Sequence, residues 1–537
     1  QIVTGSSVST TLNMAAGEGE LLEVSGNLSI DLFGFFQVSG GFALKQSSGE
    51  VVLEGSATAT PVDLLTLGAA NVSAFAGING GTDDAVGFSL AGVDFALAIM
   101  TDQADAARTW TALQASADTA AFSGVEALSV VASDLLIEIN RAAIDNSLVD
   151  FASMSDGGLA IANGPSSSMT LTMDGSVGPL IRASGSLELN VAGFFNVSGN
   201  FGFEKKQGQV VLNNRAFVDV DMLQIGASGA SAFVGLNGDS TTDRLGLALS
   251  DVNFGLLLAS DQLNSARTWM ALQATVGSVG FVGVNELTVS ATNLVVAINR
   301  AAGDGTVLDL LAQNVEVSSG PSTSITLNMD GSLGALIRAG GDVDINLFNF
   351  FQVSGSFAFE KSSDQVVVQD SSGTNSQVDV DKLTLGAANV SAFVGLDGGS
   401  ADQVGLSLSG VNFALALLSD QADATRRWTS LQAAATSAAF VGVDALDVSA
   451  ANIAVWINRA AHDGSVVDYA ADPLEVATGS SGQSLTLSMA AAEGELVRAV
   501  ADLNLRLAGF VSLSGRFGFE KSKKTLTTTD GTMPSSL

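Results

Sequence analysis

The chain has 537 residues, of which 47% are hydrophobic and 14% charged, so it can fill several folded cores and is not a disordered acidic tail. Its formal net charge of -33 disfavours binding to nucleic acid and makes cations, including divalent ones, the natural counter-partners. It contains no cysteine, which excludes disulfides and thiolate metal sites.

The sequence predicts no transmembrane segment. The longest mostly apolar runs, such as Val86–Met100, are shorter than about 18 residues, and this one contains Asp94. The chain begins at Gln1 without a basic stretch followed by an apolar one, so we expect any signal peptide to have been removed or to lie outside this segment.

One apolar stripe with a period of two organises the stretch Ile181–Phe203, and period two indicates β-strand. The stripe contains Ile181, Ala183, Gly185, Leu187, Leu189, Val191, Gly193, Phe195, Val197, Gly199, Phe201 and Phe203. The positions between are mostly polar, which predicts a sheet with one buried face and one face in water. The pattern recurs at Leu22–Leu44, Ile337–Phe359 and Val497–Phe519.

The recurrence defines a tandem array. Phe36, Phe195 and Phe351 occupy the same place in their copies and are 159 and 156 residues apart, and Phe510 follows after 159 residues in the same motif of the fourth copy. We divide the chain into repeat units 1–163, 164–319 and 320–478 and a partial unit 479–537. The incomplete fourth copy leads us to expect a segment of a longer array.

Each unit is expected to hold about eight strands, which stacked singly would add about 38 Å per unit. In the third copy, a hairpin is predicted at Glu360–Asp364, a second at Asp397–Asp402, and a tight turn at Asp444. The only predicted helix is short: Asp420–Trp428 and its equivalents begin with an N-cap signal.

A second signature marks places where the apolar parity slips by one residue. Small residues followed by Asn389, Asn293 or Asn452 interrupt the alternation. Asparagine tolerates unusual backbone angles, so each position predicts a β-bulge or corner.

We predict an all-β fold in which long amphipathic strands form an antiparallel meander, as an elongated rod or sandwich. Hairpin-like turns and half-polar stripes favour it. The alternative is a parallel β-solenoid with coils of about 22 residues.

Three repeated polar turns could hold calcium, because they combine glycine with oxygen-bearing side chains. The candidate ligands are Asn79, Asp84, Asn237, Asp243, Asp397 and Asp402. An Asx-turn that closes a hairpin explains the same residues without an ion, and no other cofactor is expected.

Two further clusters recur, and both are interpreted as structural. The first pairs an Asp with an Arg-x-Trp motif six residues later, and we expect it to cap a short helix and attach it to the sheet edge. The alternative is a ligand clamp with bidentate and stacking contacts. The second, Asn-Arg-Ala-Ala-x-Asp, is expected to form an Arg–Asp pair across a loop and its return strand, and a metal cup is the alternative. The members of the first cluster are Asp102, Gln103, Arg108 and Trp110; Asp261, Gln262, Arg267 and Trp269; Asp420, Gln421, Arg426 and Trp428. The members of the second, each with the aspartate that follows it, are Asn140, Arg141, Asp145 and Asp150; Asn299, Arg300, Asp304 and Asp309; Asn458, Arg459, Asp463 and Asp468.

Catalysis has little support in the sequence. There is one histidine and no cysteine, so imidazole- or thiol-based machinery is scarce, and His462 is expected on a surface loop. We therefore expect no enzyme activity.

Three motifs carry a resemblance: FFxVSGxFxFEK (Phe194–Lys205), AFVGLxG (Ala392–Gly398) and INRAAxDG (Ile457–Gly464). With these, the chain resembles the repetitive midsections of giant secreted bacterial surface proteins of the adhesin-like class. The resemblance implies an extracellular or cell-surface location and a non-catalytic role as stalk, fibre, filament or spacer. The alternatives are a calcium-dependent adhesin and a β-structure that binds an apolar ligand such as lipid. We also expect self-association that increases with salt or divalent cations.

Overall fold

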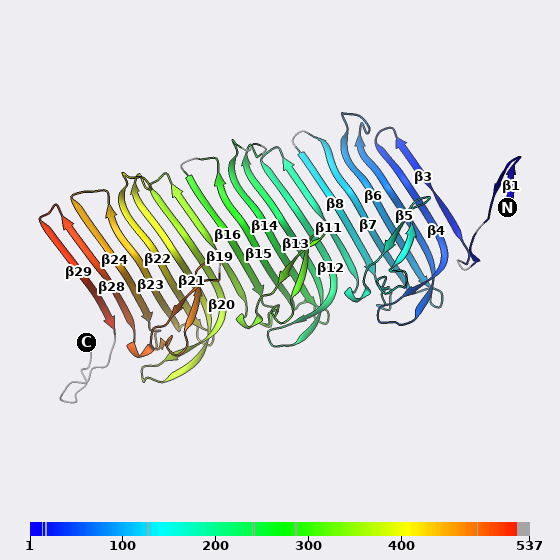
Figure 1. The fold of residues 1–537 in the computed structure, drawn as a ribbon. Coiled ribbons are helices and arrows are strands. Elements are labelled where there is room, and N and C mark those ends of the chain that lie inside the picture. The colour runs from blue at the N-terminus through cyan, green and yellow to red at the C-terminus, as the bar shows by residue number, and fades with distance from the viewer. Residues whose placement is uncertain are drawn as a thin grey trace.

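The computed structural model describes residues 1–522 apart from 13, 17–18, 126–127, 239, 241, 285–286 and 481. The chain forms one long sheet in which each long strand lies beside its neighbour in sequence (Figure 1). All strand pairings given for the described residues are antiparallel, so the predicted meander is confirmed and the parallel solenoid is wrong.

The described part of the sheet has twenty long strands, six from each full repeat unit and two from the partial one. The first unit supplies β3 (Leu22–Leu32), β4 (Phe36–Val52), β5 (Ala59–Ile78), β6 (Val86–Asp102), β7 (Thr109–Val125) and β8 (Leu128–Arg141). The second supplies β11 (Leu180–Val191), β12 (Phe195–Val211), β13 (Phe217–Leu236), β14 (Leu245–Asp261), β15 (Thr268–Val282) and β16 (Leu287–Arg300). The third supplies β19 (Leu336–Leu347), β20 (Phe351–Gln369), β21 (Asn375–Leu396), β22 (Val404–Asp420), β23 (Arg427–Val441) and β24 (Leu446–Arg459), and β28 (Leu496–Leu507) and β29 (Val511–Ser522) follow.

Successive units are joined within the sheet by the same backbone ladder as the strands inside a unit. The junction β8–β11 runs from Asn140↔Leu180 to Leu128↔Val191, and β16–β19 and β24–β28 repeat it. The sheet is open: among the described residues β3 pairs only with β4, and β29 only with β28.

At each boundary between units a small hairpin folds back over the strands of the preceding unit, and its second strand already belongs to the following unit. These hairpins are β9 (Leu159–Ala162) with β10 (Ser168–Leu171), β17 (Val315–Gly320) with β18 (Thr323–Leu327), and β26 (Leu474–Ala477) with β27 (Ser484–Leu487). We call each hairpin, with the loops around it, a cap. The 3-10 turns η2 (Gly175–Val177), η3 (Gly331–Leu333) and η4 (Ala491–Glu493) lead from the caps into the next unit, and β25 (Val466–Val467) pairs with β20. A hairpin of β1 (Ile2–Gly5) and β2 (Val8–Thr10) precedes the sheet.

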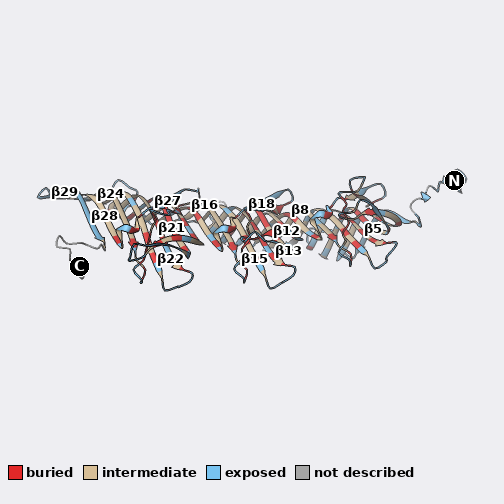
Figure 2. Cartoon of the chain, turned by 90° about the horizontal axis from the view of Figure 1, so that it is seen from below, coloured by how far each residue is buried: buried red, intermediate tan, exposed pale blue. Residues whose placement is uncertain are grey.

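The caps create three separate hydrophobic cores, one in each full unit. In the second unit the core contains Leu257 and Trp269 from the sheet and Val317 and Leu327 from the cap, all buried. Equivalent cores form around Trp110 and Trp428. Seen from below, the molecule is long and narrow, with buried residues recurring along its length (Figure 2).

Glycine brings cap and sheet backbones into contact. A Cβ on Gly226 would lie 2.3 Å from the carbonyl oxygen of Ser318 in the cap, and Gly68 and Gly386 meet their own caps in the same way. These positions require glycine because the cap crosses the sheet where a side chain would point.

The predicted bulges are confirmed. Asn293, Asn389 and Asn452 have φ of 53°, 52° and 52°, in the left-handed region that asparagine tolerates. The strand register shifts at each of these places. The hairpin across Asp397–Asp402 is also confirmed, because it joins β21 to β22.

Two local predictions are wrong. Asp420–Trp428 is a hairpin loop and not a helix, because the Asp420 carboxylate accepts from the backbone of Ala422 and from Arg426 and so closes a turn. Glu360–Asp364 is not a hairpin but the middle of β20, where ion pairs from neighbouring strands neutralise Glu360. The turn comes later, where the Asp370 carboxylate accepts from the backbone of Thr374.

We expect Gly226→Ala to loosen the cap of the second unit, because the added methyl would overlap the Ser318 carbonyl. The melting midpoint should fall, by an amount corresponding to about 1–3 kcal/mol. Gly26→Ala is the control, since nothing lies within 4 Å of its Cβ position. Equal melting of both variants and the parent would show that the caps do not need this contact.

Candidate functional site

The main functional candidate is the face of the sheet opposite the caps. On β14, Leu257 faces the cap and is fully buried, while the next residue, Leu258, points to the other side and is 37% exposed. On β11 and β12 the stripe residues Ile181, Phe195 and Phe203 are likewise about two-fifths exposed. The prediction that the apolar stripe is the buried face is therefore wrong for the single chain, because the caps lie on the other face.

Strand register joins the stripes into continuous apolar rows, one per unit. Each row crosses seven strands and passes the junction into the next unit. The three rows are Val24, Leu44, Leu67, Leu97, Leu113, Ile139 and Ile181; Ala183, Phe203, Ile225, Leu256, Leu272, Ile298 and Ile337; Ala339, Phe359, Leu385, Leu415, Leu431, Ile457 and Val497.

The rim of this face also carries exposed aromatic side chains. The turns between the first two strands of a unit include Phe33, Phe348 and Phe510, which are 95%, 61% and 91% exposed. We call the face opposite the caps the apolar face. It is a broad surface without a partner in the described residues, and a large exposed apolar surface is typical of a binding interface.

The Asp/Arg/Trp cluster and the Asn-Arg-Ala-Ala-x-Asp cluster come together as one structural clasp. In the second unit, Arg267 contacts Asp261 at 3.3 Å and Asp304 at 2.7 Å, and its guanidinium carbon lies 4.8 Å from the centre of the Trp269 ring. The indole N–H of Trp269 donates to the backbone oxygen of Thr306 at 3.1 Å. The first and third units repeat these contacts around Arg108 and Arg426.

The clasp attaches two loops to the end of the core. A structural role for these residues was expected, but the segment that they hold is a hairpin loop and not the predicted short helix. The expected Arg–Asp pair forms with a different arginine: Asp145 pairs with Arg108, which approaches from the neighbouring hairpin loop. Asn140 contributes separately, because its buried amide donates to the carbonyl of Val149 at 2.9 Å. Hydrogen bonds from Thr306, with the charge of Arg267, hold the pKa of Asp304 below its usual range.

A second group of charges lies on the cap face of β11 and β12. Arg182 contacts Glu138 and Glu204, both at 2.8 Å, and Lys206 contacts Glu204 at 2.6 Å. Glu204 is 3% exposed, so its charge depends on these partners.

The candidate calcium turns lie at hairpin ends. The side-chain amide of Asn79 donates to the backbone oxygen of Asp84, and Asn237 repeats this with Asp243 at 3.2 Å. Asn79, Asn237 and Asp397 adopt φ of 58°, 56° and 54°, and the backbone N–H of Asp402 donates to Ser400. These contacts are those of Asx- and Ser-closed turns, and calcium binding there stays a prediction.

The structure gathers one acidic group that the sequence did not indicate. Carboxylate oxygens of Glu54, Asp150 and Asp174 lie within 4.8 Å of one another. Asp150 accepts from the backbone of Gly175, and Asp174 caps the 3-10 turn η2, so two of the three have structural roles. By register the Glu54 position is Asn213 in the second unit, so the acidic trio is not repeated there.

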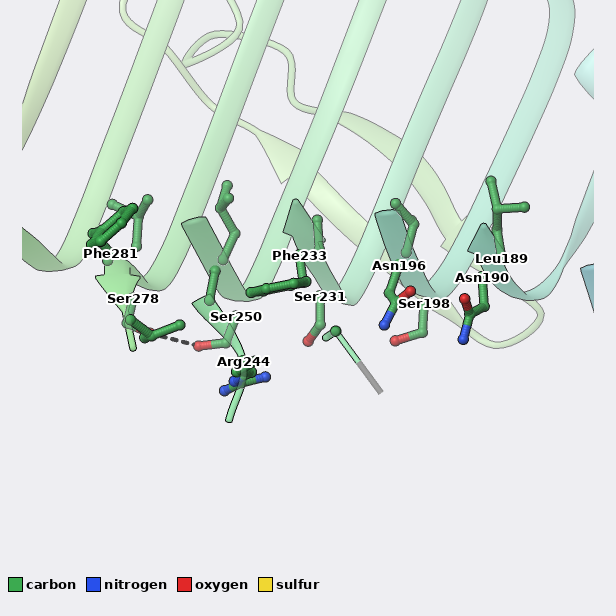
Figure 3. A pocket seen from close by; sticks show the side chains of 18 of the residues that line it. Leu189, Asn190, Asn196, Ser198, Ser231, Phe233, Arg244, Ser250, Ser278 and Phe281 are labelled. Atoms are coloured by element: carbon green, nitrogen blue, oxygen red, sulfur yellow. Dashed lines mark hydrogen bonds between the residues drawn. The ribbon is translucent and has the colours of Figure 1, made fainter. Parts of the chain in front are cut away.

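The cap side of the sheet carries a polar trough of about 800 Å³ in the second unit. Figure 3 shows serine and asparagine side chains along it, with Arg244 near the middle of the row, below Phe233. Its residues include Asn190, Asn196, Ser198, Ser231, Ser250 and Ser278. The hydroxyls of Ser250 and Ser278 bond to each other at 2.7 Å across β14 and β15. The trough therefore lies on the polar, water-exposed face that the alternation of apolar and polar residues in the sequence predicts.

No protein-family model matches the chain, and no curated protein sequence matches it. Among the described residues, no helix is long and apolar enough to cross a membrane.

Removing the arginine of the clasp should destabilise the second unit. Arg267→Ala leaves Asp261, which is 8% exposed, without its ion partner, so we expect a loss of about 1.5–3 kcal/mol. The melting midpoint measures the effect. Arg300→Ala, at an exposed strand end, should change it little. Equal loss in both variants would contradict the role of the clasp.

Glu204 should make stability fall in acid. Burial raises the pKa of its carboxyl, but hydrogen bonds and charges from Arg182 and Lys206 lower it by more, so the net pKa is below its usual range. A depressed carboxyl pKa contributes stability above its unfolded value of about 4.3, and this is lost as the pH falls through the folded value.

Thermal melts between pH 7 and pH 3 test this. Glu204→Gln should lower the midpoint at pH 7 and flatten the profile in acid, while the exposed Glu188→Gln should follow the parent. A Glu204→Gln profile parallel to that of the parent would mean that Glu204 does not contribute to the acid sensitivity.

Proposed function

We propose that the chain is a non-catalytic structural repeat array of an extracellular surface protein or filament. One observation carries this proposal: successive repeat units continue a single sheet without a linker. The ladders β8–β11, β16–β19 and β24–β28 use the same antiparallel pairing as strands within a unit. Each unit therefore extends the same sheet in the same direction.

The unit adds less length than eight stacked strands would. Only six strands of each full unit enter the sheet, because two others form the cap hairpin. At about 4.8 Å per strand, a unit advances the array by about 29 Å and not about 38 Å. The strands themselves reach 22 residues, or up to about 75 Å at about 3.4 Å per residue. The unit therefore builds breadth as well as length, which suits a filament or surface layer better than a thin spacer.

The polar clusters support a structural role. The repeated Arg, Asp and Trp residues hold loops to the core, and the buried Glu204 is held by two cations. The single histidine, His462, is exposed in a loop, as expected. The resemblance to giant secreted surface proteins is what supports an extracellular location.

Small-angle X-ray scattering of the full chain tests the shape. A sheet of twenty strands about 96 Å long and about 60 Å wide has a radius of gyration of about 33 Å. A compact globule of 537 residues would have about 24 Å. We expect the larger value at concentrations where light scattering reports one chain per particle. A value near 24 Å would remove the basis for a filament or surface array.

A further inference from the structure

The apolar face is too large to remain in water. Twenty strands at about 4.8 Å and stripes of about ten residues at about 3.4 Å give an area of roughly 3,000 Å². The largest apolar patch on a typical soluble monomer is about 300–600 Å². Exposure within it is substantial in every unit: Phe88, Val234 and Leu406 are 62%, 51% and 46% exposed.

We propose that the apolar face binds the same face of a second copy of this chain. The two sheets would form a sandwich about 10 Å thick between backbones, with the caps of both copies outside. The inference goes beyond the proposed function, because an array can extend through its junctions without any such pairing.

The area is sufficient for a stable dimer. A standard protein interface buries about 800 Å² on each partner, so overlap of about a quarter of the apolar face would be enough. A complex with much more overlap falls in the size class of obligate homodimers, whose interfaces resemble a domain core cut in half.

The repeat makes the face complementary to itself. Each unit presents an apolar row of the same seven-strand length at the same height on the sheet. Two copies related by a two-fold axis therefore match in width, spacing and composition, as an isologous interface requires. A polar partner would leave its hydrogen-bonding groups unpaired against this face.

The charge distribution permits the contact despite a net charge of -33. On β11 and β12, the stripe carries no charged side chain from Ile181 to Val191 or from Phe195 to Phe203. The charges Arg182 and Glu204 point to the cap face, and the candidate calcium turns lie at hairpin ends. Pairing through the apolar face thus leaves these charged groups in water.

Single cysteines can locate the interface, because the chain has none of its own. Leu247→Cys places a thiol on the apolar face of β14, where Leu247 is 41% exposed in the single chain. Ser250→Cys is the matched control: Ser250 is an exposed residue of the same strand that lines the polar trough. Sedimentation or light scattering of the full chain gives the particle mass in parallel.

We expect a particle of twice the mass of one chain, with the thiol of Leu247→Cys labelled by a maleimide at least tenfold more slowly than that of Ser250→Cys. Dilution to the monomer should abolish the difference. Equal labelling at concentrations where the particle is a dimer would overturn the proposal, as would a chain that stays monomeric. The proposal would also be overturned if the protein is a monomer, the Leu247→Cys thiol is protected and solvent extraction of the protein releases lipid. The apolar face would then bind acyl chains.

A charge on the face gives an independent measurement. Val234→Glu should weaken the dimer by tenfold or more, because the carboxylate would be buried without a partner. Ser231→Glu, on the cap side of the same strand, should leave the dissociation constant unchanged. Both variants should keep the circular dichroism spectrum of the parent. Equal dissociation constants for the two variants would contradict the proposal, while the scattering test of the extended shape would stand unaffected.

Discussion

The backbone ladder that runs without interruption through twenty described strands is the constraint on which the rest depends. Because each of the three described junctions between units is itself a ladder, the units on either side of it are held in one sheet and cannot rotate freely against each other. Side chains on all strands are therefore held in common rows. A stripe that is only a local alternation in sequence becomes a continuous face across the whole molecule.

The caps make the two faces of the sheet different. They cover one end of the strands on one side only, so a strand such as β14 is apolar on both sides at that end and alternates at the other. The glycine at 226 lets the cap approach, and the clasp around Arg267 and Trp269 holds the adjoining loops. These contacts close three small cores that stabilise the array while leaving the opposite face open.

Electrostatics and hydrophobicity are separated in the same way. The ion pairs of Arg182 and Glu204 lie on the cap side, and the exposed acidic turns lie at the strand ends. An acidic chain normally keeps its copies apart, but this separation leaves one surface where repulsion is weak and apolar area is large. Under the proposed function and the proposed pairing, this separation would let one face bind a second layer while the charged outer surfaces stay in water.

The sequence by itself determined the strand period, the repeat length and the bulges. Each of these depends on local chemistry: alternation of side chains, recurrence of phenylalanines such as Phe195, and the tolerance of Asn389 for a left-handed backbone. The hairpin predicted at Glu360 and the helix predicted at Asp420 were wrong. Charged and polar residues of this kind occur in turns, at helix starts and as ion pairs within a strand, so their composition alone does not distinguish these structures. Only the tertiary structure decided which partner Arg108 takes, that Glu54 meets Asp150, and that the caps fold onto the half-polar face. The apolar stripe cannot report whether anything covers it, since burial is a property of the neighbours that folding brings to a strand and not of the strand alone.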